Sequence, residues 1–277
     1  MPKQITFKIR GFARESIGQF DGQKYNTTFE YHSITLKPYH FFMKDLFGKA
    51  LYNYVTGISK EDLITETSIS EEDILPISYL FRGYDQMPSI EQKALALCRG
   101  SVLDIGAGSG SHSLYLQEVQ KMDVTALDNS KGSIQCCQQR GILKTIHMDV
   151  FDLKDVAFDT LLMLMNGSGL FGTYQEVTEK LKQLKNLLKA GGQILIDSSD
   201  IIYMFDQDED GGHWVSTEND YYGELEYTLK YQGESQTTSW LYLDFNSLAK
   251  LSEDAGLHCE LILKGDHFDY LAKLSIK

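Results

Sequence analysis

The sequence has little of what would place a protein in a membrane, outside the cell or on nucleic acid. Its longest apolar run, Leu161 to Met165, falls far short of the roughly 18 residues that a membrane-spanning helix needs. The four cysteines show no CxxC spacing, which argues against a zinc site and against a disulfide framework. Basic residues number 26 against 39 acidic ones, and the net charge of -13 disfavours a general affinity for nucleic acid.

Proline is also scarce, at four residues, while apolar residues make up 42% and aromatic residues 12% of the chain. This composition is typical of a globular protein and argues against disorder throughout. A chain of 277 residues is long enough for one large domain, or for a core domain with an appended cap. The N-terminus, MPKQITFKIRGFARES, lacks the apolar run of a secretory signal. The sequence therefore predicts a folded, cytoplasmic protein with reduced cysteines, no bound metal and no membrane or nucleic-acid partner.

From residue 101 onward, apolar stretches of strand length alternate with longer amphipathic stretches, which is the pattern of a parallel sheet covered by helices. The stretch 158–166 is apolar at nearly every position, as expected of a strand covered on both faces. Gly191 and Gly192 are expected to stop the helix before the fifth strand. The predicted strands are 101–106, 122–128, 145–149, 158–166 and 193–199, with helices over 111–119, 131–140 and 174–189.

The pattern changes beyond the fifth strand. The acidic stretch 206–214 has no periodicity and predicts a loop over the strand ends. Segments 224–231 and 237–244 alternate in polarity and predict an antiparallel hairpin added to the domain. A helix over 245–256 and a second hairpin over 258–276 follow.

Upstream, the sequence is mostly helical in pattern. The stretch 42–57 repeats apolar residues on one helical face, and 88–100 leads directly into the first strand. Residues 1–40 contain short alternating segments with no obvious partner, so they are an extension whose structure the pattern leaves open. The predicted organisation is this extension, a helical cap or lid over 41–100, and a ligand-binding domain over 101–277 with an insertion at 200–244.

The segment VLDIGAGSG, residues 102–110, carries the strongest functional signal. It runs from a strand through Gly106, Gly108 and Gly110 into a helix. Glycines suit a tight turn and let a ligand lie against the backbone at the helix N-terminus, where side chains would block it. An ordinary strand-to-helix turn is the alternative interpretation.

Three aspartates fall at the predicted carboxyl ends of strands, where open α/β sheets bind ligands. Asp128 can accept hydrogen bonds from both hydroxyls of a ribose, and Asp104 lies in reach of a cationic amino group. Asp149, followed by Val150, can accept the amino proton of an adenine while its neighbours pack the ring. The alternative for each is a solvated aspartate or a helix cap. Together they indicate a nucleotide site.

A nicotinamide-dependent oxidoreductase shares the ribose carboxylate and is the main enzymatic alternative. Its GxGxxG fingerprint requires glycine at position 111, which here is Ser111. The third glycine of this chain is instead Gly110. The spacing therefore disfavours a dinucleotide.

These segments resemble the class I S-adenosylmethionine-dependent methyltransferases over about residues 75–277, through LDIGAGSG, VTALD, HMDVF and FDTLLMLMNGSG. The resemblance implies a doubly wound, mostly parallel, seven-stranded Rossmann-like α/β sheet with an antiparallel edge strand, a helical cap and an added hairpin. It also implies S-adenosylmethionine as cofactor. The implied cofactor-binding residues are Asp104, Gly106, Gly108 and Gly110 for the methionine part, Asp128 and Asn129 for the ribose, Asp149 and Val150 for the adenine, Asn166 beside the sulfonium, and Tyr79 and Arg82 in a lid.

One subgroup of this family, which methylates bases of nucleic acids, carries Asn or Asp followed by Pro-Pro and an aromatic residue after the fourth strand. Here that position reads MNGSG. With the acidic charge, this disfavours a nucleic-acid substrate. The predicted cap, the added hairpin and the lack of basic stripes favour a small-molecule acceptor, to which the methyl group is transferred by in-line displacement. A module that binds S-adenosylmethionine or S-adenosylhomocysteine without catalysis is an alternative. Candidates for a general base are Asp197, Asp200, Tyr203 and His213.

Overall fold

The computed structural model describes residues 44–277 apart from 209, 211 and 216–219. The predicted extension 1–40 therefore lies outside the described residues. Within them, no helix combines the length and apolar character that crossing a membrane would take. Two separate sheets organise this part of the chain, one of seven strands and one of four.

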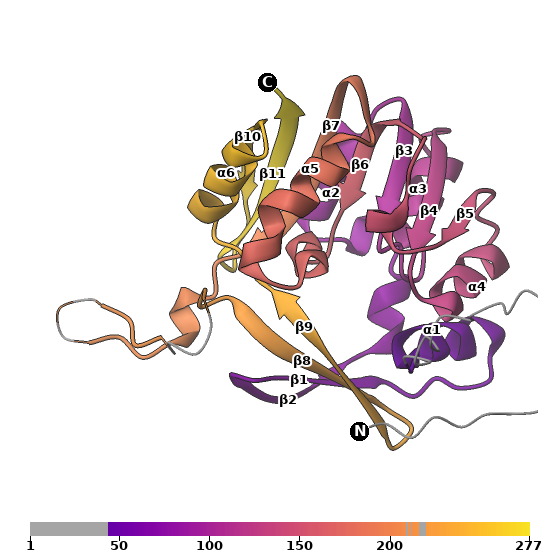
Figure 1. The fold of residues 1–277 in the computed structure, drawn as a ribbon. Coiled ribbons are helices and arrows are strands. Elements are labelled where there is room, and N and C mark those ends of the chain that lie inside the picture. The colour runs from indigo at the N-terminus through magenta and orange to yellow at the C-terminus, as the bar shows by residue number, and fades with distance from the viewer. Residues whose placement is uncertain (1–43, 209, 211, 216–219) are drawn as a thin grey trace, which may run out of the picture. The chain divides into compact units, whose positions relative to one another are not determined.

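The seven-stranded sheet is the predicted α/β core. Its strands are β3 (Ser101–Ile105), β4 (Asp123–Asp128), β5 (Thr145–His147), β6 (Phe158–Met163), β7 (Leu188–Ser199), β10 (Leu257–Lys264) and β11 (Asp269–Ile276). They lie in the order β10-β11-β7-β6-β3-β4-β5 (Figure 1). The first five pair in parallel, while β11 runs antiparallel to β7 and to β10. The strand order reverses between β3 and β6, so the crevice at their carboxyl ends is a topological switch point.

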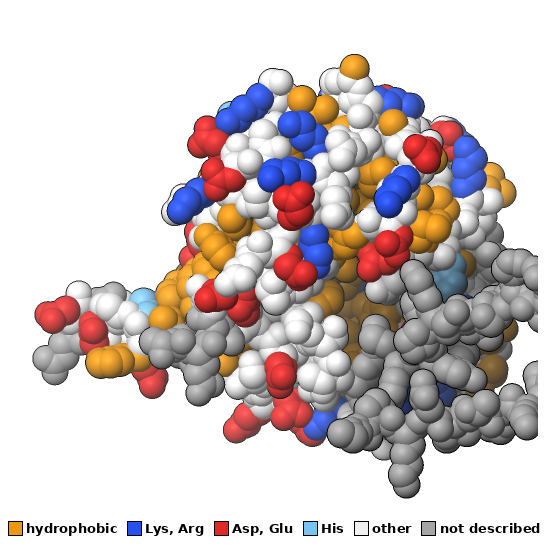
Figure 2. Space-filling model, viewed as in Figure 1, with side chains coloured by type: hydrophobic (Ala, Val, Ile, Leu, Met, Phe, Trp, Pro, Cys, Tyr) orange, Lys and Arg blue, Asp and Glu red, His pale blue; other side chains and the backbone are white. Residues whose placement is uncertain are grey.

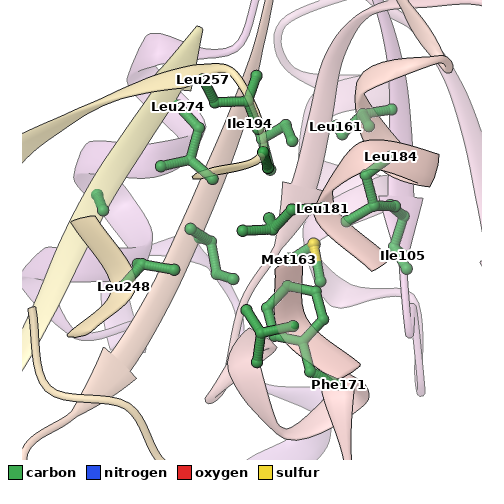
Figure 3. Close-up of a cluster of buried hydrophobic side chains, with 14 of the residues drawn as sticks. Ile105, Leu161, Met163, Phe171, Leu181, Leu184, Ile194, Leu248, Leu257 and Leu274 are labelled. Carbon is green, nitrogen blue, oxygen red and sulfur yellow. The ribbon is translucent and has the colours of Figure 1, made fainter. Parts of the chain in front are cut away.

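Helices cover both faces of this sheet, as its buried apolar strands require. They are α2 (Ser89–Leu97), α3 (Ser111–Glu118), α4 (Lys131–Gln139), α5 (Val177–Lys185) and α6 (Phe245–Asp254). Leu161, Met163 and Ile194 pack with Leu181 of α5 and Leu248 of α6 on one face (Figure 3). Alternate strand residues point to the opposite face, where they pack with α2 and α3.

Several helices and strands begin or end at residues other than those predicted from the sequence. Strand β5 ends two residues before Asp149, and β6 ends at Met163 because the backbone at Met165 and Asn166 turns to positive φ. The helix predicted over 174–189 is a 3₁₀ turn followed by α5, which ends at Lys185. Gly191 and Gly192 do not stop it; they lie inside β7, where Gly191 has a φ of 73° and the β6–β7 register shifts.

The four-stranded antiparallel sheet was predicted only in part. Its strands are β1 (Leu63–Thr67), β2 (Ser70–Leu75), β8 (Glu224–Tyr231) and β9 (Glu234–Leu241), in the order β2-β1-β8-β9. The hairpin β8–β9 confirms the predicted antiparallel hairpin, although β9 begins and ends three residues early. Over the described residues of the predicted cap, 44–100, the helical elements are α1 (Leu46–Thr56), two short 3₁₀ turns and α2. Its β1–β2 hairpin escaped prediction because β2 is largely exposed and carries no clear alternation of burial.

Candidate active site

The glycine-rich turn after β3 is the centre of the candidate site. The backbone there adopts left-handed conformations at Gly106, Gly108 and Gly110, with φ of 71°, 54° and 80°. Residues with a Cβ rarely adopt such angles, and a Cβ at Gly110 would also overlap the side chain of Ile142. Helix α3 begins directly after Gly110, so the turn presents backbone N–H groups at a helix N-terminus.

Asp128, the last residue of β4, stabilises this turn through hydrogen bonds to its backbone. Its carboxylate accepts the N–H of Gly108 at 2.9 Å and the N–H of Ser130, the N-cap of α4, at 2.8 Å. Burial raises the pKa of Asp128 to about 6; the two N–H groups oppose this rise and the charge of Asp45 adds to it. The carboxylate predicted to bind a ribose therefore lies against the glycine turn and caps its backbone.

Asp104 lies in β3 with its side chain directed toward α3. The hydroxyl of Ser113 donates to its carboxylate at 2.6 Å, and the residue is buried. Burial raises the pKa of Asp104, while the charge of His112 and the hydrogen bonds from Ser113 oppose the rise. Asp104 is thus an internal carboxylate that ties β3 to α3 across the glycine turn.

The residues predicted to bind the adenine lie farther along the same sheet edge. Asp149 is exposed, and its carboxylate accepts the N–H of Phe151 at 3.0 Å, which caps the 3₁₀ turn Val150–Asp152. Val150 is buried in the core, and Asn129 is exposed. Because β3, β4 and β5 are neighbours in the sheet, the three predicted aspartates follow one another along its carboxyl edge.

A buried ionic cluster lies beneath the lid segment. The guanidinium of Arg82 and the ring of His112 each contact the carboxylate of Glu91, the latter at 2.8 Å. Burial alone would raise the pKa of Glu91, but hydrogen bonds and charges from His112 and Arg82 lower it overall. Burial would lower the pKa of His112, but Glu91 and Asp104 raise it overall. Arg82 also stacks on the exposed ring of Tyr79 at 3.9 Å.

The turn that ends β6 is strained and heavily braced. Met165 and Asn166 have φ of 64° and 62°, unusual for residues with side chains. The Asn166 amide donates to the carbonyl of Leu241 in β9 at 3.2 Å, and its Oδ1 accepts from Ser168 and Ser198 at 3.1 and 3.0 Å. The Asn166 side chain therefore ties β6, β7 and the added hairpin together.

Among the four predicted base candidates, Asp197 lies beside this turn. Its carboxylate accepts the N–H of Gly167 at 2.9 Å and the N–H of Met165 at 3.1 Å. Burial raises the pKa of Asp197 to about 7, Glu91 contributes to the rise, and the two N–H groups oppose it. A carboxyl group of this kind can both accept and release a proton near neutral pH.

The other three candidates are placed differently. Asp200 accepts the phenolic hydrogen of Tyr222 at 2.7 Å. The ring of Tyr203 is exposed, on the 3₁₀ turn that follows β7. His213 lies in the predicted loop, where its Nδ1 is hydrogen-bonded to the carbonyl of Phe205 at 3.1 Å. Figure 1 shows this loop projecting away from the seven-stranded sheet.

Helix α1 is a part of the site that the sequence analysis missed. Gly48 of α1 and Gly132 of α4 allow a close helix crossing, since a Cβ at Gly132 would overlap the backbone of Gly48. Asp45 caps α1 and also accepts the N–H of Gly132 at 2.9 Å. Phe47 then lies over the glycine turn, 3.6 Å from where a Cβ on Gly108 would be. The small residues at the crossing were visible in the sequence, but their pairing was not.

Glu91 was also missed, although a signal for it existed. It lies three and four positions before Ala94 and Leu95, on the apolar face of α2. When a carboxylate on such a face is buried, it is usually paired with a basic group. The partners come from two other segments, so the sequence could indicate a buried acid without identifying its cluster.

Comparison with known proteins identifies the relatives of this arrangement. A family model described as a methyltransferase domain matches residues 102–192. A solved S-adenosylmethionine-dependent methyltransferase from Bacteroides fragilis, in complex with S-adenosyl-L-homocysteine, is 39% identical, with a TM-score of 0.77. The match covers 84% of this chain and 95% of that one. No curated protein matches the sequence.

More distant structures share the fold. DesVI from Streptomyces venezuelae is 17% identical over 73% of this chain and 96% of its own, with a TM-score of 0.52. The CcbJ methyltransferase from Streptomyces caelestis is 14% identical over 69% of this chain and 90% of its own, with a TM-score of 0.53. The close relative decides against the nicotinamide and non-catalytic alternatives. The chain belongs to the class I S-adenosylmethionine-dependent methyltransferases, and S-adenosylmethionine is its cofactor.

Proposed function

We propose that this methyltransferase acts on a small molecule and holds its cofactor along the carboxyl edge of β3, β4 and β5. In this proposal Asp104 and the glycine turn hold the methionine part. Asp128 and Asn129 take the ribose, and Asp149 and Val150 the adenine. The chemistry that the cofactor supplies is a methyl group on a sulfonium, open to in-line displacement. The protein contributes position and shielding from water.

An orphaned donor in the lid supports this fit. The Nε–H of Arg82 is buried and has no hydrogen-bond partner among the described residues. An unsatisfied buried donor is unfavourable, and a carboxylate is the acceptor that a guanidinium binds best. A contact between Arg82 and the carboxylate of the cofactor would give this N–H its acceptor. Tyr79 would cover the methionine end of the cofactor in the same arrangement. In this arrangement the Asn166 side chain braces the turn beside the reacting methyl rather than touching it.

The four-stranded sheet is the observation that carries the small-molecule part of the proposal. It lies at the end of the core toward which β6 and β7 run, and the Asn166–Leu241 hydrogen bond links it there (Figure 1). Trp240 of β9 packs against Gly169, where an added Cβ would overlap the indole ring. In this proposal the four-stranded sheet and α1 together cover the carboxyl ends of the strands. Such a cover suits an acceptor small enough to lie beneath it.

The molecular surface agrees with a partner other than nucleic acid. Acidic and basic side chains are interspersed on the face that Figure 2 shows, with no continuous basic stripe there. Binding along a phosphate backbone needs such a stripe. A cytoplasmic location, in which the four free cysteines stay reduced, belongs to the same proposal.

Methyl-labelled S-adenosylmethionine incubated with the enzyme and a bacterial cell extract tests the proposed function. The extract is separated afterwards into small molecules, protein and nucleic acid. We expect the label in the small-molecule fraction, above the level with heat-denatured enzyme. Label that enters only protein or nucleic acid would contradict a small-molecule acceptor.

A further inference from the structure

The lid segment, residues 77–82, is hydrogen-bonded to the glycine turn. The carbonyl of Leu80, in this segment, accepts the hydroxyl hydrogens of Ser109 and Ser111, the latter at 3.1 Å. Ser109 belongs to the glycine turn, and Ser111 is the first residue of α3. Leu80 and Ser109 are buried, and a buried hydrogen bond is electrostatically stronger than one in water. The backbone of the lid is therefore attached to the turn that carries the proposed cofactor site.

Arg140, which ends α4, contacts both serines from the other side. Its Nη1 donates to the carbonyl of Ser109 at 2.8 Å, to the Ser109 hydroxyl oxygen at 3.2 Å and to the Ser111 hydroxyl oxygen at 3.0 Å. A guanidinium can only donate, so each hydroxyl directs its own hydrogen away from it. The Leu80 carbonyl is the acceptor within reach of both hydroxyls. Arg140 thereby orients the two serines toward the lid.

Arg140 also contacts the lid directly. Its guanidinium lies over the ring of Phe81, 5.0 Å from the ring centroid. The centroid of the same ring lies 4.5 Å from that of Tyr54 in α1. The face of an aromatic ring attracts a cation, and this attraction grows as water is excluded. Phe81 therefore joins the end of α4 to the lid and to α1.

Ion pairing does not account for the position of Arg140. Among the described residues, its side-chain hydrogen bonds all go to the two serines, and the charge of Glu118 acts on it without forming an ion pair. Burial lowers the pKa of Arg140, although an arginine keeps its charge in a protein. A half-buried cation without a carboxylate is unfavourable unless hydrogen bonds offset the loss of water. The contacts with the serines and Phe81 are the ones that do so.

The attachment lies between the two lid residues that the proposed function assigns to the cofactor. Tyr79 precedes Leu80, and Arg82 comes two residues after it. The Arg82 Nη1 donates to the carbonyl of Tyr79 at 2.8 Å, and its guanidinium stacks on the Tyr79 ring. The two residues are thus held together, and the hydrogen bonds of Leu80 fix the backbone between them. Neither can leave the cofactor edge while those bonds persist.

We propose that Arg140 is a positioning residue that acts through Ser109 and Ser111 to hold the lid on the glycine turn, and that this attachment sets how tightly the enzyme binds its cofactor. The proposal rests on the proposed function, in which the lid covers the methionine end of S-adenosylmethionine. When a binding-competent state is only partly populated, the apparent affinity falls in proportion to its population. Arg140 needs no contact with the cofactor to have this effect.

Hydrogen exchange followed by mass spectrometry tests the attachment without any ligand. Arg140→Met removes the guanidinium and keeps an unbranched side chain. Peptides that cover residues 77–87 should exchange at least about fivefold faster than in wild type, while peptides from β3 should keep their rate. Unchanged exchange of the lid in a folded Arg140→Met protein would overturn the proposal.

Arg99→Met is the matched control for this substitution. The guanidinium of Arg99 also donates to a backbone carbonyl, that of Gly191, at 2.6 Å. Arg99 lies just before β3 begins, at the end of the sheet opposite the glycine turn. Arg99→Met should leave exchange of the lid and binding of S-adenosylhomocysteine unchanged. Faster lid exchange in this control would show that the effect is not specific to Arg140 and would count against the proposal.

Titration calorimetry with S-adenosylhomocysteine tests the effect on the cofactor site. Arg140→Met should raise the dissociation constant by about tenfold. Arg140→Lys keeps a donor for the same oxygens and should bind at least about threefold more tightly than Arg140→Met. In a Tyr79→Ala background, Arg140→Met should have a clearly smaller effect, because both residues act through the lid. Equal effects in the two backgrounds would show that Arg140 acts independently of the lid and would overturn the proposal.

If Arg140→Met fails to fold, Ser111→Ala replaces it in both experiments, since it removes one of the two hydroxyls that bind the lid, and the same outcomes decide. A Tyr79→Ala protein with wild-type affinity would overturn the lid contacts of the proposed function and, with them, the effect of Arg140 on affinity. The acceptor is tested separately. An absence of labelled small molecule in the extract experiment would overturn only the small-molecule acceptor, because both experiments on Arg140 use no acceptor.

Discussion

In the proposed cofactor site, single carboxylates serve the fold and the ligand with the same atoms. Asp128 holds the glycine turn through Gly108 and the start of α4 through Ser130. Its oxygens each have a second lone pair for a ligand hydroxyl. A residue that caps the backbone and binds a ribose cannot be replaced by its amide, because the amide nitrogen is a donor where an acceptor is needed.

Asp128→Asn should therefore weaken binding of S-adenosylhomocysteine by about tenfold or more, since a hydrogen bond to a charged group contributes about 1.5–3 kcal/mol. Titration calorimetry measures the dissociation constant, and circular dichroism confirms that the variant is folded. Asp123→Asn, at the opposite end of β4 in an exposed ion pair with Lys144, serves as the control. Unchanged affinity in a folded Asp128→Asn protein would mean that Asp128 only caps the backbone.

Glu91 carries a second residue-scale prediction, because its carboxylate is the shared partner of two buried basic groups, Arg82 and His112. Glu91→Gln should lower the free energy of unfolding by about 3 kcal/mol, the usual effect of removing one partner of a buried ion pair. Urea denaturation measures it. Glu179→Gln, in an exposed pair with Lys182, should change stability by less than about 0.5 kcal/mol. Equal effects of the two substitutions would contradict a buried ionic role.

The pH dependence of this stabilisation follows from the two pKa shifts. The pKa of Glu91 is lowered from its ordinary 4.5, so its contribution is complete above 4.5 and is lost as the pH falls through the folded value. The pKa of His112 is raised from 6.5, so its contribution is complete below 6.5 and is lost as the pH rises through the folded value. The stability difference between wild type and Glu91→Gln should thus be largest between 4.5 and 6.5.

At the scale of elements, the crossing of α1 and α4 decides whether the glycine turn is covered. The two helices approach through Gly48 and Gly132, and Asp45 bridges them. Only the absence of a Cβ at Gly132 allows the backbone of α1 to lie so close. A side chain there would push α1, and with it Phe47, away from the turn.

Gly132→Ala should lower the free energy of unfolding by about 1–3 kcal/mol, as overpacking usually does, and should weaken S-adenosylhomocysteine binding. Urea denaturation and calorimetry measure the two effects. The matched control is Gly83→Ala, which has open space around its Cβ position and a negative φ, and should change stability by less than about 0.5 kcal/mol. A Gly132→Ala protein with wild-type stability would show that the crossing tolerates a methyl group.

Element boundaries depend on the same kind of contact. The apolar run 158–166 was predicted to be one strand, but hydrogen bonds of Asn166 to β7 and β9 hold a turn at its end. Periodicity reports burial, and buried turn residues are as apolar as strand residues. For this reason the strand was predicted correctly and its end was not.

At the scale of the whole molecule, cofactor binding should stabilise the folded state. A ligand at 100 times its dissociation constant adds about 2.7 kcal/mol. For a chain of this size we expect the melting temperature to rise by roughly 5–10 °C with S-adenosylhomocysteine. NAD⁺ or NADH at the same concentration should leave it unchanged. Differential scanning fluorimetry makes the comparison, and a rise with NADH instead would contradict the cofactor assignment.

The sequence by itself determined what is local. Alternating apolar runs specified the parallel sheet and its helices, and the glycines at 106, 108 and 110 specified a left-handed turn, since residues with a Cβ adopt such backbone angles only at a cost in free energy. The aspartates at the strand ends followed from the same register.

Tertiary structure alone decided what depends on pairing between distant segments. Lys230 of β8 joins Glu66 of β1, 164 residues earlier, so the second sheet exists only once the core has brought its two hairpins together. The cluster of Arg82, Glu91 and His112 arises in the same way from the lid, α2 and α3. Such contacts leave little trace in sequence, because many partners would satisfy one strand edge or one buried carboxylate, and the fold selects among them.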